Sequence, residues 1–196
     1  MPRYYGIRLA AIVVVALSLG ACGQVDDPLG AHEDELDPDA YSIDAEATVP
    51  LEIFSLHDEA SVEAFILAFP DLESRIRAQA QSAANDLHPQ AIPFCNLTAA
   101  VSTSWTTGNK YGRGRVSCSE LFLEADLGVE IFDHANGIGA SAGKVCGWTK
   151  ACSKNTSGIP NVPNGDYCAY ADVVVFGTYW GGAAGTDTCS GGSGGR

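Results

Sequence analysis

The segment LFLEADLGVEIFD, residues 121–133, alternates between two kinds of side chain along its length. One side is aliphatic and comprises Leu121, Leu123, Ala125, Leu127, Val129 and Ile131. The other side comprises Phe122, Glu124, Asp126, Gly128, Glu130 and Phe132. Because successive side chains of a β-strand point to opposite faces, this period of two predicts a half-buried strand, with a bend or bulge near Gly128.

Four further segments between residues 91 and 190 have the composition of strands. They are rich in Val, Thr and aromatic residues and cover residues 97–106, 114–118, 143–149 and 167–180. Clusters of Gly, Asn and Pro separate them, and no helical period intervenes. This pattern predicts an antiparallel β-sandwich over residues 91–190, followed by a flexible Gly/Ser tail at 191–196.

Six of the seven cysteines fall within this predicted sandwich. An exported domain of this size gains stability from disulfide cross-links. Six cysteines can pair in many ways. We favour pairing of sequence neighbours: Cys95 with Cys118, Cys146 with Cys152, and Cys168 with Cys189. Zinc sites typically use Cys-x-x-Cys pairs, which the chain lacks, so we expect disulfides and no metal.

Upstream of the sandwich the hydrophobic period changes to about 3.6 residues. The first helical face is Val62, Phe65, Ile66 and Phe69; the second, after Pro70, is Leu72, Ile76, Ala80, Ala83, Ala84 and Leu87. Because proline lacks an N–H and Asp71 is a favourable cap, residues 51–90 are predicted to hold two helices or one kinked helix. We expect the apolar stripe to pack on the sandwich; a partner-binding amphipathic helix is the alternative.

Most of the net charge of −13 lies before the sandwich. Residues 23–90 hold sixteen acidic residues and two arginines, whereas residues 91–196 have eight acidic and seven basic residues. A stretch with few large apolar residues and many like charges stays solvated, so residues 22–50 are predicted to be a disordered tether. Asp37 and Asp39 have the spacing of a calcium loop, but Tyr41, Ser42 and Thr48 depart from that pattern, and no calcium site is expected.

The first 21 residues are typical of a secretory signal peptide. Arg3 and Arg8 lead into an uncharged segment from Leu9 to Ala21. As a helix this segment rises only about 20 Å, which is short of the roughly 30 Å hydrocarbon core of a bilayer. We therefore expect cleavage rather than a membrane span.

The segment ends in Leu19, Gly20, Ala21 and Cys22, which resemble the lipobox of bacterial lipoproteins. The resemblance implies a cleaved chain that begins at Cys22 and carries two or three acyl chains, enough for stable membrane attachment. The alternative is ordinary cleavage near Ala21, with Cys22 left as a thiol. Gly23 stands where an aspartate signals retention at the inner membrane in many bacteria, so the resemblance implies the outer membrane of the cell envelope.

Three motifs of the predicted sandwich resemble small secreted β-sandwich modules of bacteria. They are GRVSC at 114–118, CGWTKAC at 146–152 and GDYCAYADVVVFG at 165–177. The resemblance covers about 100 of the 196 residues and implies an immunoglobulin-like fold without a particular activity. Cys168 and Cys189 depart from the commoner pattern of such modules.

A hydrolase could be built from Asp133 and His134 with Ser117, Ser119 or Ser141 as nucleophile. No Gly-x-Ser-x-Gly elbow, His-Glu-x-x-His helix or Gly-rich phosphate loop accompanies these residues. The motif DHANG at 133–137 is more typical of a turn. We therefore predict a protein without enzymatic activity and without a cofactor.

Aromatic residues support a binding hypothesis instead, because exposed rings stack on sugars or anchor protein partners. We predict Trp105, Tyr179 and Trp180 as binding residues, and name Tyr111 and Tyr170 as further candidates. Trp148, which lies beside a cysteine, is expected in the core. A sandwich with nearly balanced charge and an acidic tether has no basic track for phosphates, so no nucleic-acid partner is expected.

These expectations combine into a lipid-anchored protein of the cell envelope. Its sandwich is predicted to be a non-enzymatic module that binds a glycan or an envelope protein. Two alternatives stay open: a periplasmic hydrolase that uses His134 and Asp133, and a structural component of an envelope complex.

Replacing Cys22 tests the attachment. In a bacterium with a lipoprotein pathway, the wild-type chain should incorporate a palmitate analogue and the Cys22→Ser chain should not, because only a thiol accepts the diacylglyceryl group. Intact mass with and without reductant should show acyl chains on Cys22 and three bridges among the other six cysteines. Recovery of a mature, soluble and unacylated wild-type chain would contradict the prediction.

Overall fold

The computed structural model describes residues 41–84 and 92–191. Three predictions lie outside these ranges: the signal peptide, the acylation of Cys22 and the tail beyond residue 191. The first part of the predicted tether and the end of the second helical face, Leu87, also lie outside them.

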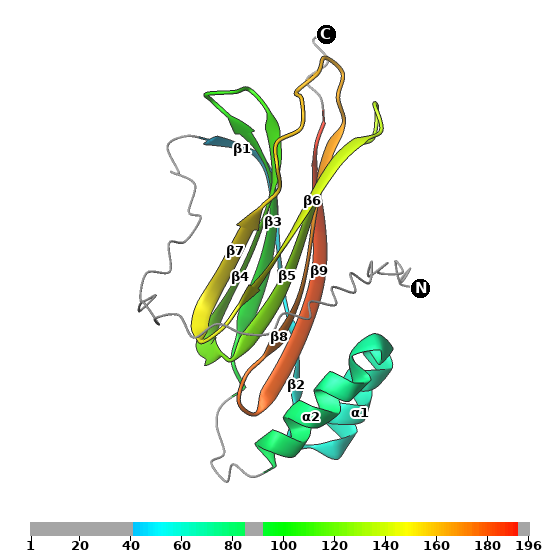
Figure 1. The fold of residues 1–196 in the computed structure, drawn as a ribbon, viewed down its shortest axis with the longest axis vertical. Coiled ribbons are helices and arrows are strands. Elements are labelled where there is room, and N and C mark those ends of the chain that lie inside the picture. Colours follow the sequence, from blue (N-terminus) through cyan, green and yellow to red (C-terminus); the bar gives the residue numbers. More distant parts are fainter. Residues whose placement is uncertain (1–40, 85–91, 192–196) are drawn as a thin grey trace, which may run out of the picture. The chain divides into compact units, whose positions relative to one another are not determined.

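Two antiparallel sheets form a β-sandwich (Figure 1). The four-stranded sheet has the order β1-β3-β4-β7, and the five-stranded sheet has the order β2-β9-β8-β5-β6. The strands are β1 (Tyr41–Pro50), β2 (Glu52–Ser55), β3 (Cys95–Ser104), β4 (Lys110–Phe122), β5 (Glu124–Asp133), β6 (Ile138–Cys146), β7 (Thr149–Asn155), β8 (Tyr167–Phe176) and β9 (Trp180–Ser190). The predicted fold class is thereby confirmed: a mainly β, disulfide-linked antiparallel sandwich with a short helical segment before most of its strands.

The boundaries before the sandwich differ from the prediction. Residues 41–50, expected in the tether, form strand β1, which pairs with β3 from Tyr41↔Ser104 to Pro50↔Asn96. Residues 52–55, expected in the helical segment, form β2 on the edge beside β9. Both are edge strands, which tolerate exposed charges, and this is why an acidic composition concealed them.

The helical segment is broken at proline, as predicted. Helix α1 (Glu59–Ala68) and helix α2 (Glu73–Ala83) flank a short 3-10 helix, η2 (Pro70–Leu72). Asp58 caps α1 by accepting a hydrogen bond from the backbone N–H of Ser61 at 2.9 Å. Asp71, the expected cap, lies inside η2, and α2 begins without a side-chain cap.

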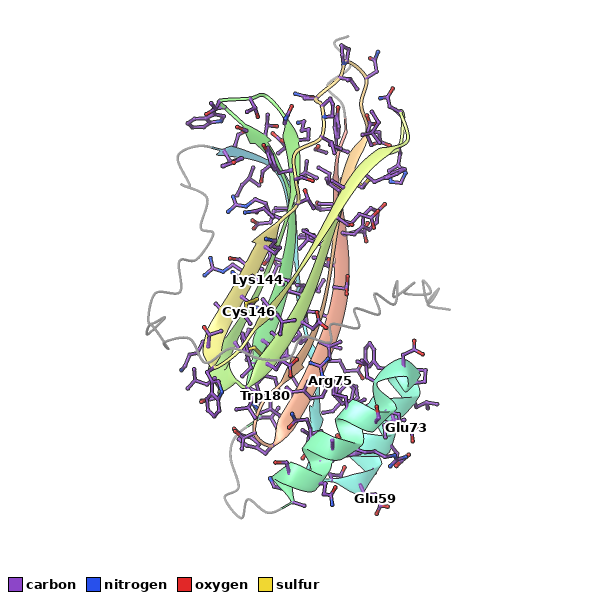
Figure 2. All side chains as sticks on the ribbon, viewed as in Figure 1. Glu59, Glu73, Arg75, Lys144, Cys146 and Trp180 are labelled. Atoms are coloured by element: carbon purple, nitrogen blue, oxygen red, sulfur yellow. A yellow bond between two sulfur atoms is a disulfide. The ribbon has the colours of Figure 1, made fainter. Side chains whose placement is uncertain are left out.

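The helices bury their apolar stripe against the five-stranded sheet, as expected. Phe65 is fully buried, stacks on Phe54 of β2 with ring centroids 4.5 Å apart, and approaches Phe176 of β8. Arg75 of α2 lies over the Phe176 ring and donates a hydrogen bond to Glu124 at 2.6 Å (Figure 2). The helix pair is therefore part of the sandwich unit.

The alternating segment 121–133 is not one strand. Ala125, Leu127, Val129 and Ile131 face the core as predicted. However, β4 ends at Phe122 in one sheet and β5 begins at Glu124 in the other, so the alternation changes phase at Leu123. Phe122 is therefore buried and Leu121 half exposed, the reverse of the prediction. Gly128 stays in register with both of its neighbouring strands, without a bulge.

The three predicted disulfides are confirmed: Cys95–Cys118, Cys146–Cys152 and Cys168–Cys189. The first joins β3 to β4, and the third joins β8 to β9. Cys146–Cys152 links β6 of one sheet to β7 of the other. The bridges thus fix neighbouring strands at two positions and the two sheets at a third.

Docking of the helices predicts a contrast between two positions of α1. Phe65→Ala should lower the free energy of unfolding by about 3–5 kcal/mol, because it leaves a cavity between helix and sheet. Leu67→Ala, on the same helix with Leu67 85% exposed, should change it by less than about 0.5 kcal/mol. Urea denaturation measures both. Equal effects would show that the helix is not docked as described.

Candidate binding site

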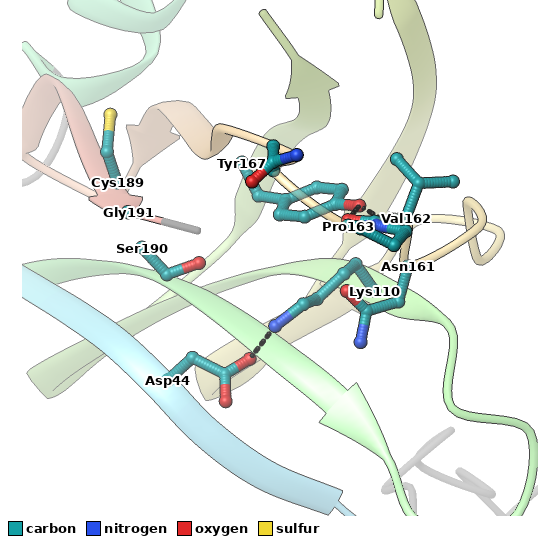
Figure 3. Close-up of a pocket in the computed structure, with 10 residues that line it drawn as sticks. Asp44, Lys110, Asn161, Val162, Pro163, Tyr167, Cys189, Ser190 and Gly191 are labelled. Carbon is teal, nitrogen blue, oxygen red and sulfur yellow. Dashed lines mark hydrogen bonds and ion pairs between the residues drawn. The ribbon is translucent and has the colours of Figure 1, made fainter. Parts of the chain in front are cut away.

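A cavity of about 620 Å³ opens at one end of the sandwich (Figure 3). It lies where β1 and β4 begin and β9 ends, beneath the loop between β7 and β8. Its lining is mostly polar and comprises Asp44, Lys110, Asn161, Val162, Pro163, Asn164, Tyr167, Cys189, Ser190 and Gly191. These residues come from four separate parts of the chain.

An ion pair forms the floor of this cavity. The pairing of β1 with β3 shifts between Ile43 and Ala45, and the intervening residue is Asp44. Asp44 Oδ2 accepts hydrogen bonds from Lys110 Nζ at 2.9 Å and from Thr103 Oγ1 at 2.5 Å. The two charged side chains are only 24% and 13% exposed. Because the charges are opposite, the floor is polar and has no net charge.

Tyr167 holds the loop above the ion pair. Its hydroxyl accepts from the backbone N–H of Val162 at 2.7 Å and donates to the carbonyl of Pro160 at 3.1 Å. Lys110 Nζ lies 5.3 Å from the centre of the same ring. The buried tyrosine therefore positions the segment that carries Asn161 and Asn164, whose side chains line the cavity.

Ser190 supplies a buried polar group without a protein partner. Its Oγ is inaccessible to solvent and has no hydrogen-bond partner among the described residues. Ser190 pairs with Tyr167 across β8 and β9, next to the Cys168–Cys189 bridge. Lys110 Nζ has three N–H groups, and the described residues engage one of them. Lys110 can therefore offer hydrogen bonds to a ligand directly, and Ser190 can do so after its side chain rotates toward the cavity.

The predicted aromatic site is not assembled. Trp180 is 1% exposed and Tyr179 is also buried, so both belong to the core and the prediction of binding roles for them was wrong. Trp105 is 68% exposed, follows the end of β3 and lies at the same end as the cavity without lining it. Trp148, expected in the core, is 77% exposed. Trp180 begins a strand covered by the helix pair, whereas Trp148 lies in the turn between β6 and β7.

Asp133 closes a turn, as the DHANG motif predicted. Its carboxylate accepts hydrogen bonds from Asn136 Nδ2 at 2.7 Å and from the backbone N–H groups of Ala135 and Asp166, each at 3.0 Å. Burial raises the pKa of Asp133, but hydrogen bonds from Asn136, Asp166 and Ala135 outweigh it and hold the pKa below 3.8. These contacts are structural.

His134 points to a different neighbour. Its Nε2 lies 2.9 Å from the hydroxyl of Tyr170. Among the described residues, no hydrogen bond joins the side chains of Asp133 and His134, and Ser119 Oγ accepts from the backbone of Phe94. The hydrolase hypothesis gains no support from this geometry.

Within residues 41–84 and 92–191, no three His, Cys, Asp or Glu side chains are grouped to hold a metal ion. In the same ranges neither α-helix is long and apolar enough to span a membrane. Comparisons with family models, curated proteins and solved structures found no match to the chain.

The cavity residues were not among the binding residues predicted from the sequence. Asp44 was assigned to the tether, and Lys110 carries no motif. A signal did exist in GIPNVPNG at 158–165, since two prolines and two asparagines in a long turn favour an ordered loop with polar side chains. What joins that loop to Asp44 and Ser190 is strand order, which the sequence does not display.

The lowered pKa of Asp133 predicts a pH dependence of stability. An ionised carboxylate that is hydrogen-bonded in the folded state stabilises it above the unfolded pKa, and this contribution disappears as the pH falls through the lower, folded pKa. Wild type should therefore lose stability as the pH falls from about 5 through the lowered folded pKa, and Asp133→Asn should be less stable near neutrality and depend less on pH in that range. Thermal unfolding across this range measures both.

Asp187→Asn is the matched control, since Asp187 is an exposed carboxylate on β9. It should leave stability at neutral pH close to that of wild type. An Asp133→Asn chain with the stability and the acid dependence of wild type would show that the turn does not depend on the carboxylate.

Proposed function

We propose that this protein is an exported lipoprotein, anchored through Cys22 and displayed from the outer membrane, whose sandwich is a non-enzymatic module that binds a glycan. The lipobox-like sequence and the uncharged leader support export and attachment. The three disulfides agree with an oxidising compartment outside the cytosol.

The cavity at the end of the sandwich carries the glycan proposal. Its groups donate and accept hydrogen bonds in similar number: Lys110 Nζ donates, Asp44 accepts, and Ser190 and the two asparagines do both. A sugar hydroxyl also donates and accepts, so a set of mixed polarity matches a hydroxyl-rich ligand. Because the Lys110–Asp44 ion pair has no net charge, the floor of the cavity favours neither an anion nor a cation.

The size and support of the cavity agree with this ligand class. A volume of about 620 Å³ lies in the range of sites for small ligands. Its walls are held by the Tyr167 hydrogen bonds and by the Cys168–Cys189 bridge, so little ordering is needed when a ligand binds. Trp105 is exposed at the same end and offers a ring for a longer glycan that extends beyond the cavity.

Two single substitutions test the site. After a ligand is found on an array of cell-wall and lipopolysaccharide saccharides, Ser190→Ala and Asn161→Ala should each weaken its binding about fivefold, since a lost hydrogen bond is worth about 1 kcal/mol. Titration calorimetry measures the affinity. Ser190→Ala should not lower the free energy of unfolding, because Ser190 Oγ has no partner among the described residues.

Ser141→Ala is the matched control, because Ser141 is exposed on β6 of the five-stranded sheet and does not line the cavity. It should bind like wild type. The cavity would be excluded as the binding site if a saccharide bound all three variants equally. An array without any binder would contradict the glycan proposal.

A further inference from the structure

Exposed apolar side chains gather at the end of the sandwich opposite the cavity. We call this set the apolar end: Ile92, Phe94, Leu121, Val145 and Trp148, each half or more exposed. Phe94 precedes β3, Leu121 lies near the end of β4, and Val145 near the end of β6. The cavity, by contrast, lies where β1 and β4 begin.

Backbone pairings place Phe94, Leu121 and Trp148 at this end together. The N–H of Ser119 donates to the carbonyl of Phe94 at 2.9 Å, two residues before Leu121. Phe122, which follows Leu121, pairs with Thr149, which follows Trp148. Leu121, near the end of β4, and Trp148, just before β7, therefore lie close to each other.

Trp148 combines a strained backbone conformation with an exposed ring. Its φ of 54° is left-handed, a conformation that is unfavourable for a bulky residue, and its ring is 77% exposed. The Cys146–Cys152 bridge encloses the five residues 147–151, with Trp148 among them. A glycine would adopt this backbone without strain, so an indole held outward in a cross-linked loop indicates a binding role.

Lysines accompany the apolar residues. Lys150 lies in the same loop and donates a hydrogen bond to the carbonyl of Ser119 at 2.8 Å. Lys144 lies on β6, two residues before Cys146 (Figure 2). Two acidic residues lie near Leu121 in sequence: Glu120, and Glu124, which pairs with Arg75. Tryptophan with lysine is the combination favoured at the boundary between lipid headgroups and acyl chains.

We propose that the apolar end rests on the lipid bilayer, with Trp148 inserted at the headgroup level. Rings and aliphatic side chains at strand ends and in turns suit a fluid surface better than a rigid partner helix, which needs a groove. The cavity then faces away from the membrane. This inference rests on the proposed attachment at Cys22.

The length of the chain before β1 permits this orientation. β1 begins at Tyr41, at the cavity end, and eighteen residues, 23–40, separate it from Cys22. That number of residues can span at most about 60 Å. The longest strand, β4, is 13 residues and so about 43 Å long. The chain can therefore run back along the sandwich and still place acylated Cys22 in the bilayer.

Tryptophan quenching tests which end touches lipid. The acylated full-length protein is reconstituted in vesicles of phosphatidylethanolamine and phosphatidylglycerol, with and without brominated acyl chains. Trp105→Phe should keep the quenching by bromine, because Trp148 remains, and Trp148→Phe should lose it. Trp180 is buried in both variants and serves as the common background.

Each outcome bears on the inference. Quenching lost in Trp105→Phe but kept in Trp148→Phe would place the cavity end on the membrane and overturn it. No quenching from either exposed tryptophan, with the protein still floating with the vesicles, would overturn it and leave attachment intact; the apolar end would then be free for a protein partner. Failure of the wild-type chain to float would overturn attachment and inference together.

Discussion

The two sheets meet closely because β4 carries glycine where it faces β5. A Cβ on Gly114 would come within 2.5 Å of Val129 Cγ2, and one on Gly112 within 2.9 Å of the Glu130 carbonyl oxygen. Side chains at alternate positions of a strand share a face, so Lys110 enters the sandwich on the same side as these glycines. The close approach brings Lys110 of one sheet near the Tyr167 ring of the other, whereas Asp44 reaches Lys110 within the four-stranded sheet, across β3. The contact between the floor of the cavity and Tyr167 therefore depends on the spacing of the two sheets.

Two disulfides stabilise the two ends of the sandwich. Cys168–Cys189 lies next to Tyr167 and Ser190, so it fixes the wall of the cavity at the ends of β8 and β9. Cys146–Cys152 joins the two sheets at the other end and closes the loop that carries Trp148. Each bridge stabilises mainly by restricting the unfolded chain. Both ends of the sandwich thus present residues on a cross-linked frame.

Local patterns predicted what depends on neighbouring residues, and failed where distant strands decide. The alternation of 125–131, the break at Pro70 and the pairing of sequence-neighbouring cysteines were all readable, because each reflects local geometry. The strand at 41–50 could not be predicted from local sequence, because its acidic residues resemble a tether and its order depends on pairing with β3. Trp180 and Trp148 were reversed for the same reason: burial of Trp180 depends on helices more than a hundred residues earlier in the chain.

The buried carboxylate of Asp133 links the turn at 133–137 to the cavity. It accepts a hydrogen bond from the N–H of Asp166, the residue before Tyr167, while the N–H of His134 donates to the carbonyl of Asp166. Tyr167 in turn holds Val162 and Pro160 in the loop over the cavity. Asp133, which resembles a catalytic acid in the sequence, thereby stabilises the loop over the cavity. Because these hydrogen bonds need the ionised carboxylate, we expect protonation of Asp133 to loosen the loop and to weaken the proposed binding in the cavity, although Asp133 does not line it.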